Sequence, residues 1–434
     1  MARERGSLAD GEPGARAAAL AILLCCGAWP AARAEENKSY QQLNVLIDAL
    51  EYIEQNYVSD VDAEKLLYGA TNGMVEVLDP FSQFMPPDLA KDFKEETNGE
   101  FGGLGIRIGV RGDWLSVITP LPGTPAYKAG LLPNDRIVKL DGQNAKGLSL
   151  AEASRILRGA PGTKITITVA RPPQGEAKEW TPVDFSLTRS LIRVDAVHAQ
   201  MLQGRIGYVR IAEFSAHVPE DIAKEVSGLL KGGALSLVLD LRNNPGGLLQ
   251  GAVEVASDFL DAGKLIVYIQ GRQAGSRREF RAAGKARFAG LPMIVLVNEG
   301  SASASEVLAG ALQDNRRALI VGDRTFGKAS VQTLIPLPDG SALRLTVASY
   351  FTPSGKSIHR DEKTGAGGII PDIVIPVDSG TAAKLQAQDE RIYAPGRPAR
   401  NAQAAGPLKD PVLERAVELL EGFALLQTRG PSGD

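Results

Sequence analysis

Two short segments of the 434-residue sequence place a hydroxyl and an amine where hydrolytic chemistry could take place. In the first, the apolar run at residues 293–297 predicts a buried strand, and a helix is predicted to begin near Ser303. The first turn of a helix carries unpaired N–H groups and the positive end of the helix dipole, which stabilise a developing oxyanion. Small neighbours, Ala302 and Ala304, leave the approach to the hydroxyl open. Ser303 is therefore a candidate nucleophile.

A serine hydroxyl at its ordinary pKa is a weak nucleophile and needs a base to accept its proton. The three histidines, His198, His217 and His359, lie outside the predicted strand-end loops, and no Gly-x-Ser-x-Gly elbow surrounds Ser303. A Ser-His-Asp triad remains an alternative. A purely structural alternative also exists, because Ser303 with Glu306 three residues later fits a helix capping box.

The second segment, residues 322–332, offers Lys328 as the base. A lysine accepts a proton only when its amine is neutral, and an apolar pocket favours the neutral form by lowering the pKa. The flanking residues Phe326, Gly327 and Ala329 are apolar or small, which fits such a pocket. The two segments together are compatible with hydrolysis by a serine–lysine pair, and a solvent-exposed surface charge is the structural alternative for Lys328.

The same segment also resembles a phosphate-binding loop, because Gly322, Gly327 and Lys328 fit the pattern Gly-x-x-x-x-Gly-Lys. Ala329 stands where that motif needs a hydroxyl for magnesium. The motif should also open a helix, whereas the alternating β-branched residues Val331, Thr333 and Ile335 predict a strand. Nucleotide binding is therefore the less favoured interpretation.

A third segment, residues 240–247, follows the apolar run at 235–241, which predicts another buried strand. Its end, Pro-Gly-Gly at 245–247, permits a tight turn with backbone N–H groups facing outward. A plain turn is the alternative. In context, Gly246 or Gly247 is expected to supply an oxyanion donor beside the N–H of Ala304.

These segments sit within a region, residues 205–377, in which predicted strands and helices alternate. Apolar runs at 235–241, 265–269 and 293–297 predict strands buried on both faces, and helical patterns follow at 251–260 and 303–314. Such alternation indicates an α/β domain with a largely parallel sheet, whose sites lie beyond the carboxyl ends of the strands.

Three further regions flank this core. Residues 41–74 carry a helical apolar pattern, and residues 101–171 combine short strands, glycine turns, a helix at 150–157 and a strand at 164–169. The stretch 379–407 has the composition of a linker, and 412–426 predicts one last amphipathic helix.

The first 34 residues are typical of a secretory signal peptide: arginines, an apolar run, then Ala32-Arg33-Ala34. An uncleaved membrane anchor is the alternative. Both cysteines, Cys25 and Cys26, fall in this leader, so disulfides, zinc thiolates and a cysteine nucleophile are excluded from the mature chain. The net charge of −3 argues against a large nucleic-acid-binding surface.

Taken together, the three segments resemble the C-terminal processing peptidases, the tail-specific serine proteases of family S41. The resemblance rests on Leu-Arg-x-Asn-Pro-Gly-Gly, Gly-Ser-Ala-Ser-Ala-Ser-Glu and Thr-Phe-Gly-Lys-x-x-Val-Gln in that order, with residues 78–85 and 350–355 also matching. It implies that Ser303 is the nucleophile, Lys328 the general base, Gln332 the residue that orients the lysine, and Glu306 a supporting acid.

The resemblance also implies a multidomain α/β and β fold. Its expected parts are a signal peptide (1–34), a helical N-terminal region (35–96), a PDZ domain (97–175), a protease core with crotonase/ClpP-like architecture (190–378), and a linker with a C-terminal helix (379–434). In the PDZ domain the resemblance assigns peptide carboxylate binding to Gly103, Leu104, Gly105 and Ile106, with Arg158 as a ligand-sensing residue.

The expected function is that of a serine endopeptidase of the bacterial periplasm or cell envelope that cuts proteins with flexible C-terminal tails. The resemblance implies no metal, no cofactor and no nucleic-acid partner, but a homodimer and an activating adaptor protein. Two alternatives remain: a catalytically inactive PDZ scaffold in the envelope, and a nucleotide-dependent enzyme at Gly322–Lys328.

Overall fold

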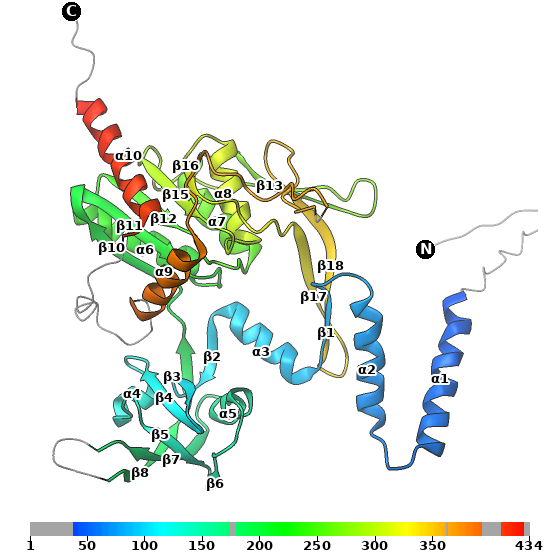
Figure 1. Ribbon diagram of the computed structural model, residues 1–434. Coiled ribbons are helices and arrows are strands. Elements are labelled where there is room, and N and C mark those ends of the chain that lie inside the picture. Colours follow the sequence, from blue (N-terminus) through cyan, green and yellow to red (C-terminus); the bar gives the residue numbers. More distant parts are fainter. Residues whose placement is uncertain (1–37, 174–178, 362, 393–408, 429–434) are drawn as a thin grey trace, which may run out of the picture. The chain divides into compact units, whose positions relative to one another are not determined.

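The computed structural model describes residues 38–173, 179–361, 363–392 and 409–428 (Figure 1). The expected leader, residues 1–34, lies outside the described residues. By its internal contacts the chain divides into two compact units, Met1–Thr71 and Asn72–Asp434.

Two helices, α1 (Lys38–Asn56) and α2 (Ala63–Glu76), account for the helical pattern predicted over 41–74. The chain leaves the helical conformation between them, and the Asp62 carboxylate accepts the Lys65 N–H at the start of α2. The apolar side chains Leu43 and Ile47 of α1 are exposed. Among the described residues, none of the helices has the length and apolarity needed to span a bilayer.

The core of the second unit is a six-stranded sheet in the order β10-β11-β12-β15-β16-β19. All neighbours from β11 onward pair in parallel, and β10 pairs antiparallel with β11. This confirms the largely parallel α/β sheet predicted from the alternation of elements. The strands are β10 (Val197–Leu202), β11 (Ile206–Ile211), β12 (Ser236–Asp240), β15 (Met293–Val297), β16 (Leu319–Gly322) and β19 (Ile373–Val374), with a short 3-10 turn, η1 (Gln203–Arg205), between the first two.

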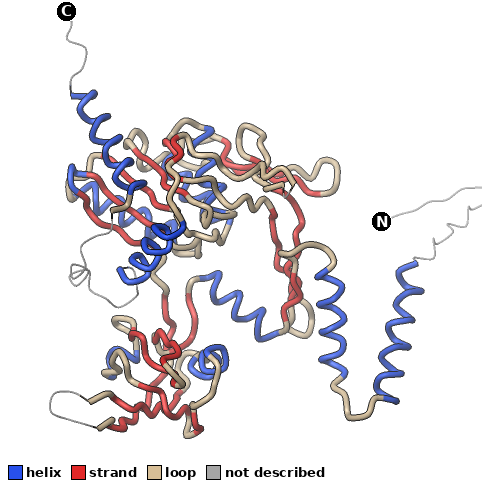
Figure 2. Tube along the Cα trace, in the orientation of Figure 1, coloured by secondary structure: helices blue, strands red, loops and turns tan. Residues whose placement is uncertain are grey.

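Both faces of this sheet are covered, which explains the continuous apolar runs (Figures 1 and 2). On one face, Leu237 and Leu239 of β12 belong to a cluster with helices α6 (Val218–Lys231), α7 (Leu249–Phe259) and α8 (Ala304–Asp314). On the other face, Val238 packs with α10 (Pro411–Thr428). Fully burying each such side chain stabilises the fold by roughly 1.5–3 kcal/mol.

A second, antiparallel sheet contains β1, β18, β13 and β14, with β17 paired to β18. The prediction that the run at 265–269 is a strand buried on both faces is wrong in part. It is strand β13, but most of its residues are only half-buried because it pairs with β14 and β18 outside the parallel sheet. The bounds are β1 (Gln83–Met85), β13 (Leu265–Gly271), β14 (Arg278–Arg281), β17 (Ser330–Pro336) and β18 (Ala342–Phe351).

The PDZ region has its own sheet, β3-β4-β5-β7-β8, with β6 paired to β5, and its own apolar core around Val117, Ile137 and Ile167. The helix predicted at 150–157 is α5 (Leu150–Leu157), which begins with a complete Ser149–Glu152 capping box. The remaining elements are β3 (Ile106–Arg111), β4 (Trp114–Pro120), α4 (Pro125–Ala129), β5 (Arg136–Leu140), β6 (Gln143–Asn144), β7 (Lys164–Arg171) and β8 (Thr181–Thr188).

This sheet extends beyond residue 175, the expected end of the PDZ domain, because β8 pairs with β7 along its whole length from Thr181 to Thr188. A two-stranded ribbon, β2 (Glu100–Gly103) with β9 (Ser190–Arg193), brings the two ends of the region together. Helix α3 (Pro87–Asn98) precedes β2 and ends in the left-handed residue Gly99.

The prediction that residues 379–407 form a linker is wrong for the first part of this stretch, which forms α9 (Ser379–Ile392). Its alanine, glutamine, lysine and leucine residues have high helix propensity, and the Asp378 carboxylate caps the helix by accepting the Thr381 N–H at 3.0 Å. The rest of that segment, residues 393–408, lies outside the described residues. The predicted terminal helix is confirmed as α10.

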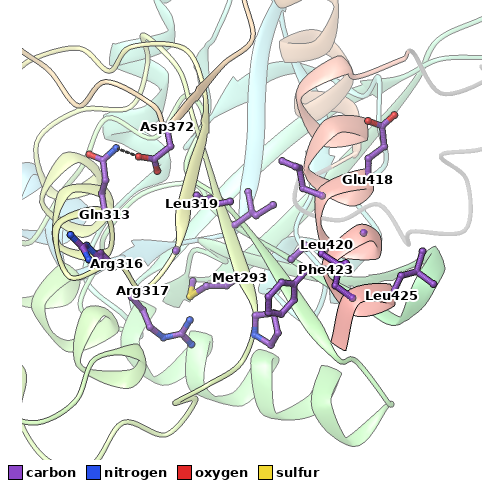
Figure 3. A pocket seen from close by; sticks show the side chains of 16 residues that line it. Met293, Gln313, Arg316, Arg317, Leu319, Asp372, Glu418, Leu420, Phe423 and Leu425 are labelled. Carbon is purple, nitrogen blue, oxygen red and sulfur yellow. Dashed lines mark hydrogen bonds between the residues drawn. The ribbon is translucent and has the colours of Figure 1, made fainter. Parts of the chain in front are cut away.

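A large apolar cavity of about 980 Å³ lies between α10 and the start of β15, with Met293, Leu420 and Phe423 among its lining (Figure 3). Since Met293 is the first residue of β15, this cavity is at the amino end of the strand. Ser303 follows the carboxyl end of the same strand.

Candidate active site

The structure brings the three sequence segments together at the carboxyl ends of β12, β15 and β16. A cavity of about 660 Å³ at this edge is lined by Ser303, Lys328, Gln332, Gly246 and Gly247, together with residues of α3 and β18. Three loops that are distant in sequence therefore contribute to one cavity, as the parallel sheet requires.

Ser303 occupies the N-cap of α8 in a backbone conformation that few side chains adopt, with φ 54° and ψ −113°. Strained backbone of this kind costs of order 1–3 kcal/mol and persists only where surrounding contacts hold it. The Glu306 side chain accepts the Ser303 N–H at 2.8 Å, as the capping-box pattern predicted. The strain fits a residue whose hydroxyl must be held toward a cavity rather than one that merely caps a helix.

Glu306 is completely buried and its carboxylate accepts four hydrogen bonds. Oε2 takes the N–H groups of Ser303 at 2.8 Å and Lys328 at 2.9 Å. Oε1 takes the Thr325 hydroxyl at 2.5 Å and the Gly327 N–H at 2.7 Å. Burial raises the pKa of Glu306, while these hydrogen bonds act against that rise. Glu306 thus joins the serine loop to the lysine loop.

Lys328 is half-buried, and its amine contacts two groups. Nζ donates to Gln332 Oε1 at 3.4 Å and lies 4.5 Å from the centroid of the Phe81 ring. Burial lowers the pKa of Lys328, the charge of Arg344 lowers it further, and Asp79 opposes the shift. The lysine is therefore placed in the environment that a neutral amine requires.

No hydrogen bond joins the Lys328 amine to the Ser303 hydroxyl among the contacts of the described residues. The Ser303 side chain instead interacts with the buried Tyr350. Burial raises the pKa of Tyr350 to about 12, and the interaction with Ser303 acts in the opposite direction. Both Ser303 and Lys328 line the same cavity, so their side chains are presented to the same space.

The backbone of Gly246 lies directly against the serine. A Cβ at this position would be 2.9 Å from Ser303 Cβ and 3.0 Å from the Ala304 nitrogen, and φ is 105°. The Gly246 N–H donates to Asn244 Oδ1 at 2.9 Å. Of the two glycines predicted as oxyanion donors, Gly247 is therefore the better candidate for the partner of Ala304.

Sequence reasoning missed four residues that contact the site: Asp79, Phe81, Arg344 and Tyr350. Phe81 reaches the lysine and the glutamine from the turn before β1, and Arg344 reaches the same place from β18. Three of the four fall in stretches that carry part of the family resemblance: Asp79 and Phe81 in 78–85, and Tyr350 in 350–355. No local pattern indicated their contact with Lys328.

The five residues predicted to bind a peptide C-terminus also come together. Gly103, Leu104, Gly105, Ile106 and Arg158 line one small cavity of about 100 Å³, at the junction of β2, β3 and α5. The Arg158 guanidinium lies 4.8 Å from the Phe101 ring centroid and its NH1 is 3.7 Å from an Asp92 carboxylate oxygen. The Arg158 guanidinium therefore already contacts Phe101 and Asp92 beside this cavity.

Two alternatives that the sequence left open lose support: a phosphate-binding loop and a histidine base for Ser303. Residues 330–336 form strand β17, so the segment Gly322–Lys328 does not open a helix as a phosphate-binding loop must. None of the described residues that line the Ser303 cavity is a histidine. His217, for example, pairs with Glu100 at 2.9 Å.

Three family models match the chain: the peptidase family S41 at residues 205–375, a PDZ domain at 117–171, and the N-terminal domain of the activating protease CtpB at 28–88. A carboxy-terminal-processing protease of Bartonella bacilliformis is 43% identical over 348 residues, covering 78% of this chain and 76% of its own. This chain belongs to peptidase family S41. It is a serine-type peptidase of the carboxy-terminal processing type.

Other relatives of this S41 peptidase also match over most of both chains. A carboxyl-terminal-processing protease of Picosynechococcus is 38% identical over 374 residues, covering 81% of this chain and 87% of its own. The carboxy-terminal processing protease CtpB of Bacillus subtilis is 35% identical over 365 residues, covering 83% and 73%. The S41 match contains all three active-site loops. The PDZ match begins after residues 103–106, so their role in carboxylate binding stays a prediction.

Proposed function

We propose that this S41 peptidase cuts its substrates with a Ser303–Lys328 dyad that Gln332 assists. The observation that carries the proposal is the shared placement of the two residues. Both line one cavity at the carboxyl end of the sheet, and both backbones are bound to the same oxygen of Glu306. Burial lowers the pKa of Lys328, which is the direction that a lysine base requires.

In the proposed reaction, neutral Lys328 takes the proton of the Ser303 hydroxyl as its oxygen bonds to the scissile carbonyl carbon. The carbonyl oxygen becomes an oxyanion held by the N–H groups of Ala304 and Gly247. The carbon–nitrogen bond then breaks, and the Lys328 ammonium returns the proton to the leaving amine. Water then attacks the carbonyl carbon of the resulting ester while Lys328 accepts one of its protons. The bond between that carbon and the Ser303 oxygen breaks, the Lys328 ammonium returns the proton to the serine oxygen, and the carboxylic acid product leaves.

Substrate capture is assigned to the PDZ domain. A peptide with a free C-terminus would add as a strand, with its carboxylate against the N–H groups of residues 103–106. The neighbouring cavity is lined by Leu104, Ile106, Ile108 and Leu157, which favours an apolar last side chain. The substrate class is therefore unfolded or flexible protein tails with an apolar end.

The remaining proposals concern the setting of the enzyme. We place it in the periplasm or cell envelope, exported by residues 1–34, with a membrane anchor as the alternative. The match of residues 28–88 to the N-terminal domain of an activating protease supports an activating protein partner. The exposed apolar residues of α1 and α2 support a homodimer. The proposed domain limits are those expected from the sequence, with the PDZ sheet extended to residue 188 and with helix α9 at the start of the segment expected to be a linker.

The test is cleavage of an unfolded protein that carries an apolar C-terminal tail, followed by mass spectrometry of the fragments. The purified protein is expected to release fragments, and the variants Ser303→Ala and Lys328→Ala are expected to release none. Wild-type cleavage by either variant contradicts the dyad. A wild-type chain that binds the tail without cutting it supports the alternative of an inactive scaffold.

A further inference from the structure

We propose that Phe81 is a positioning residue of the active site: its carbonyl orients Gln332 and its ring supports the Lys328 amine. The inference rests on the proposed Ser303–Lys328 dyad and goes beyond it. Phe81 precedes the PDZ region in the sequence, far from both catalytic loops, and lies in the turn before β1.

The carbonyl of Phe81 determines which way the Gln332 amide faces. It accepts a hydrogen bond from Gln332 Nε2, and a second from Arg344 Nε at 3.2 Å. A carbonyl oxygen can only accept, so the glutamine must present its NH₂ to Phe81 and its oxygen to the other side. That oxygen is the atom to which Lys328 Nζ donates at 3.4 Å. The orientation of Gln332 thus follows from the Phe81 backbone.

This orientation decides where the lysine can accept a proton. A neutral amine has two N–H donors and one lone pair. When one N–H is bound to Gln332 Oε1, the lone pair is left to face the shared cavity, which Ser303 also lines. An inverted amide would present NH₂ to the lysine and compete for that lone pair.

The ring of Phe81 acts on the protonated form of Lys328, the ammonium. It lies 4.5 Å from Lys328 Nζ, within the range of a cation–π interaction, which stabilises an ammonium and not a neutral amine. Among the described residues, no carboxylate forms an ion pair with Lys328. The ring therefore supports the ammonium that forms when Ser303 gives up its proton, without the large pKa increase that a neighbouring carboxylate would cause.

The turn that carries Phe81 is rigid enough to position another residue. The Asp79 carboxylate accepts the N–H of Phe81 at 2.8 Å, the N–H of Ser82 at 2.9 Å and the Ser82 hydroxyl at 2.6 Å. The Ser82 hydroxyl accepts the Thr346 N–H at 3.1 Å, and β1 then pairs with β18. The turn is thereby bound to the strand that also carries Arg344 and Tyr350.

The charged groups around the lysine determine the direction of each pH effect. Arg344 on β18 lowers the pKa of Lys328, and Asp79 in the turn raises it. Lys94 and Glu96 of α3 and Glu213 after β11 line the same cavity, and Glu306 of α8 binds the lysine backbone. Phe81 is uncharged, so removal of its ring leaves all of these charges in place.

The experiment compares the pH dependence of kcat and kcat/KM for a short peptide substrate. We expect Phe81→Leu to lower kcat about tenfold through misplacement of the amine. We also expect the acidic limb of kcat/KM to shift about half a unit to one unit lower, because the ammonium loses the ring. Phe81→Tyr keeps the ring and is expected to stay within about twofold of wild type on both measures. Trifluorophenylalanine at position 81 keeps the shape of the ring but weakens its cation–π interaction with the ammonium. It should therefore shift the acidic limb of kcat/KM to lower pH without unfolding the protein.

Phe280→Leu is the matched control, because Phe280 is also half-buried and carries a cation–π contact, with Arg278 at 5.1 Å, but does not line the active-site cavity. Its pH profile should equal that of wild type. The proposal is overturned if the acidic limb of the kcat/KM profile lies at the wild-type pH in both Phe81→Leu and the protein with trifluorophenylalanine at position 81. Wild-type activity of Lys328→Ala in the same assay overturns the dyad instead, so the two failures are distinguishable.

Discussion

Ser303 and Lys328 donate their backbone N–H groups to the same atom, Oε2 of Glu306, at 2.8 and 2.9 Å. The proposed nucleophile and base therefore share one fixed reference point inside the protein. Their side chains remain free to differ in conformation, since Ser303 interacts with Tyr350 and Lys328 with Gln332 and Phe81. The shared carboxylate oxygen holds the serine loop and the lysine loop at a fixed separation.

Replacement of Glu306 by glutamine tests this shared anchor. An amide keeps one acceptor oxygen but presents an NH₂ where two donors now point, so at least one buried N–H loses its partner. We expect a loss of about 1–3 kcal/mol in the free energy of unfolding and a fall in kcat of about 100-fold. Denaturant unfolding and peptide kinetics measure the two effects. Glu299→Gln, an exposed change in the same loop, is the control and should alter neither.

The pH dependence of cleavage tests the role of Lys328. Only the neutral amine accepts the serine proton, so kcat/KM should rise with pH through the lowered pKa of this lysine, below its ordinary value of 10.5. Arg344 lowers that pKa, so Arg344→Gln should raise it and move the acidic limb to higher pH. Asp79→Asn should move it to lower pH. A pH profile that is identical in the three proteins would exclude Lys328 as the titrating base.

Close packing of Gly246 against the serine predicts that Gly246→Ala is severely damaging. The new Cβ would lie 2.7 Å from the Ala302 carbonyl oxygen and 2.9 Å from Ser303 Cβ, so the two loops that carry the proposed oxyanion donors would have to move apart. We expect kcat to fall by about 100-fold or more. Gly263→Ala is the control, since φ is +82° there but nothing lies within 4 Å of the added carbon. Equal losses of kcat in both variants would show that backbone strain, and not the site, is responsible.

Tail capture by the PDZ domain predicts a separation of kinetic constants. A substrate whose terminal carboxylate is replaced by an amide cannot occupy the N–H groups of residues 103–106, while its scissile bond is unchanged. We expect KM to rise about tenfold with kcat nearly constant. Steady-state kinetics on the paired peptides give this comparison. If the amide also lowers kcat to the same extent as it raises KM, the tail acts in the chemical step and simple capture is contradicted.

Local features of the sequence were sufficient to predict the strands and the helix that carry the candidate site residues. A strand such as β15, buried on both faces, gives a continuous apolar run. The helix start at Ser303 is indicated by the capping pattern with Glu306, and the strand at 331–335 by its alternation. Each of these signals arises from residues within one or two turns or pleats of one another. The order of the three motifs then predicted the family, which the comparisons confirm.

Local sequence patterns did not predict two features of the fold: the pairing partners of β13 and the helix α9. An apolar run predicted β13 but not its antiparallel partners, because periodicity reports burial and not which strand lies alongside. The stretch after Asp378 has linker-like composition, yet its alanine and glutamine content and its cap support α9.

The sequence by itself determined the types of chemical group available, the strands and helices that carry them, and the family to which the chain belongs. Only the tertiary structure decided which groups meet. Phe81 and Gln332 are 251 positions apart, and their contact depends on β1 pairing with β18. The proposal of Gly247 rather than Gly246 as an oxyanion donor likewise depends on a tertiary contact, because the Asn244 side chain accepts the Gly246 N–H. Such contacts join segments whose separation along the chain leaves no periodic signal, so they arise only when the sheets are assembled.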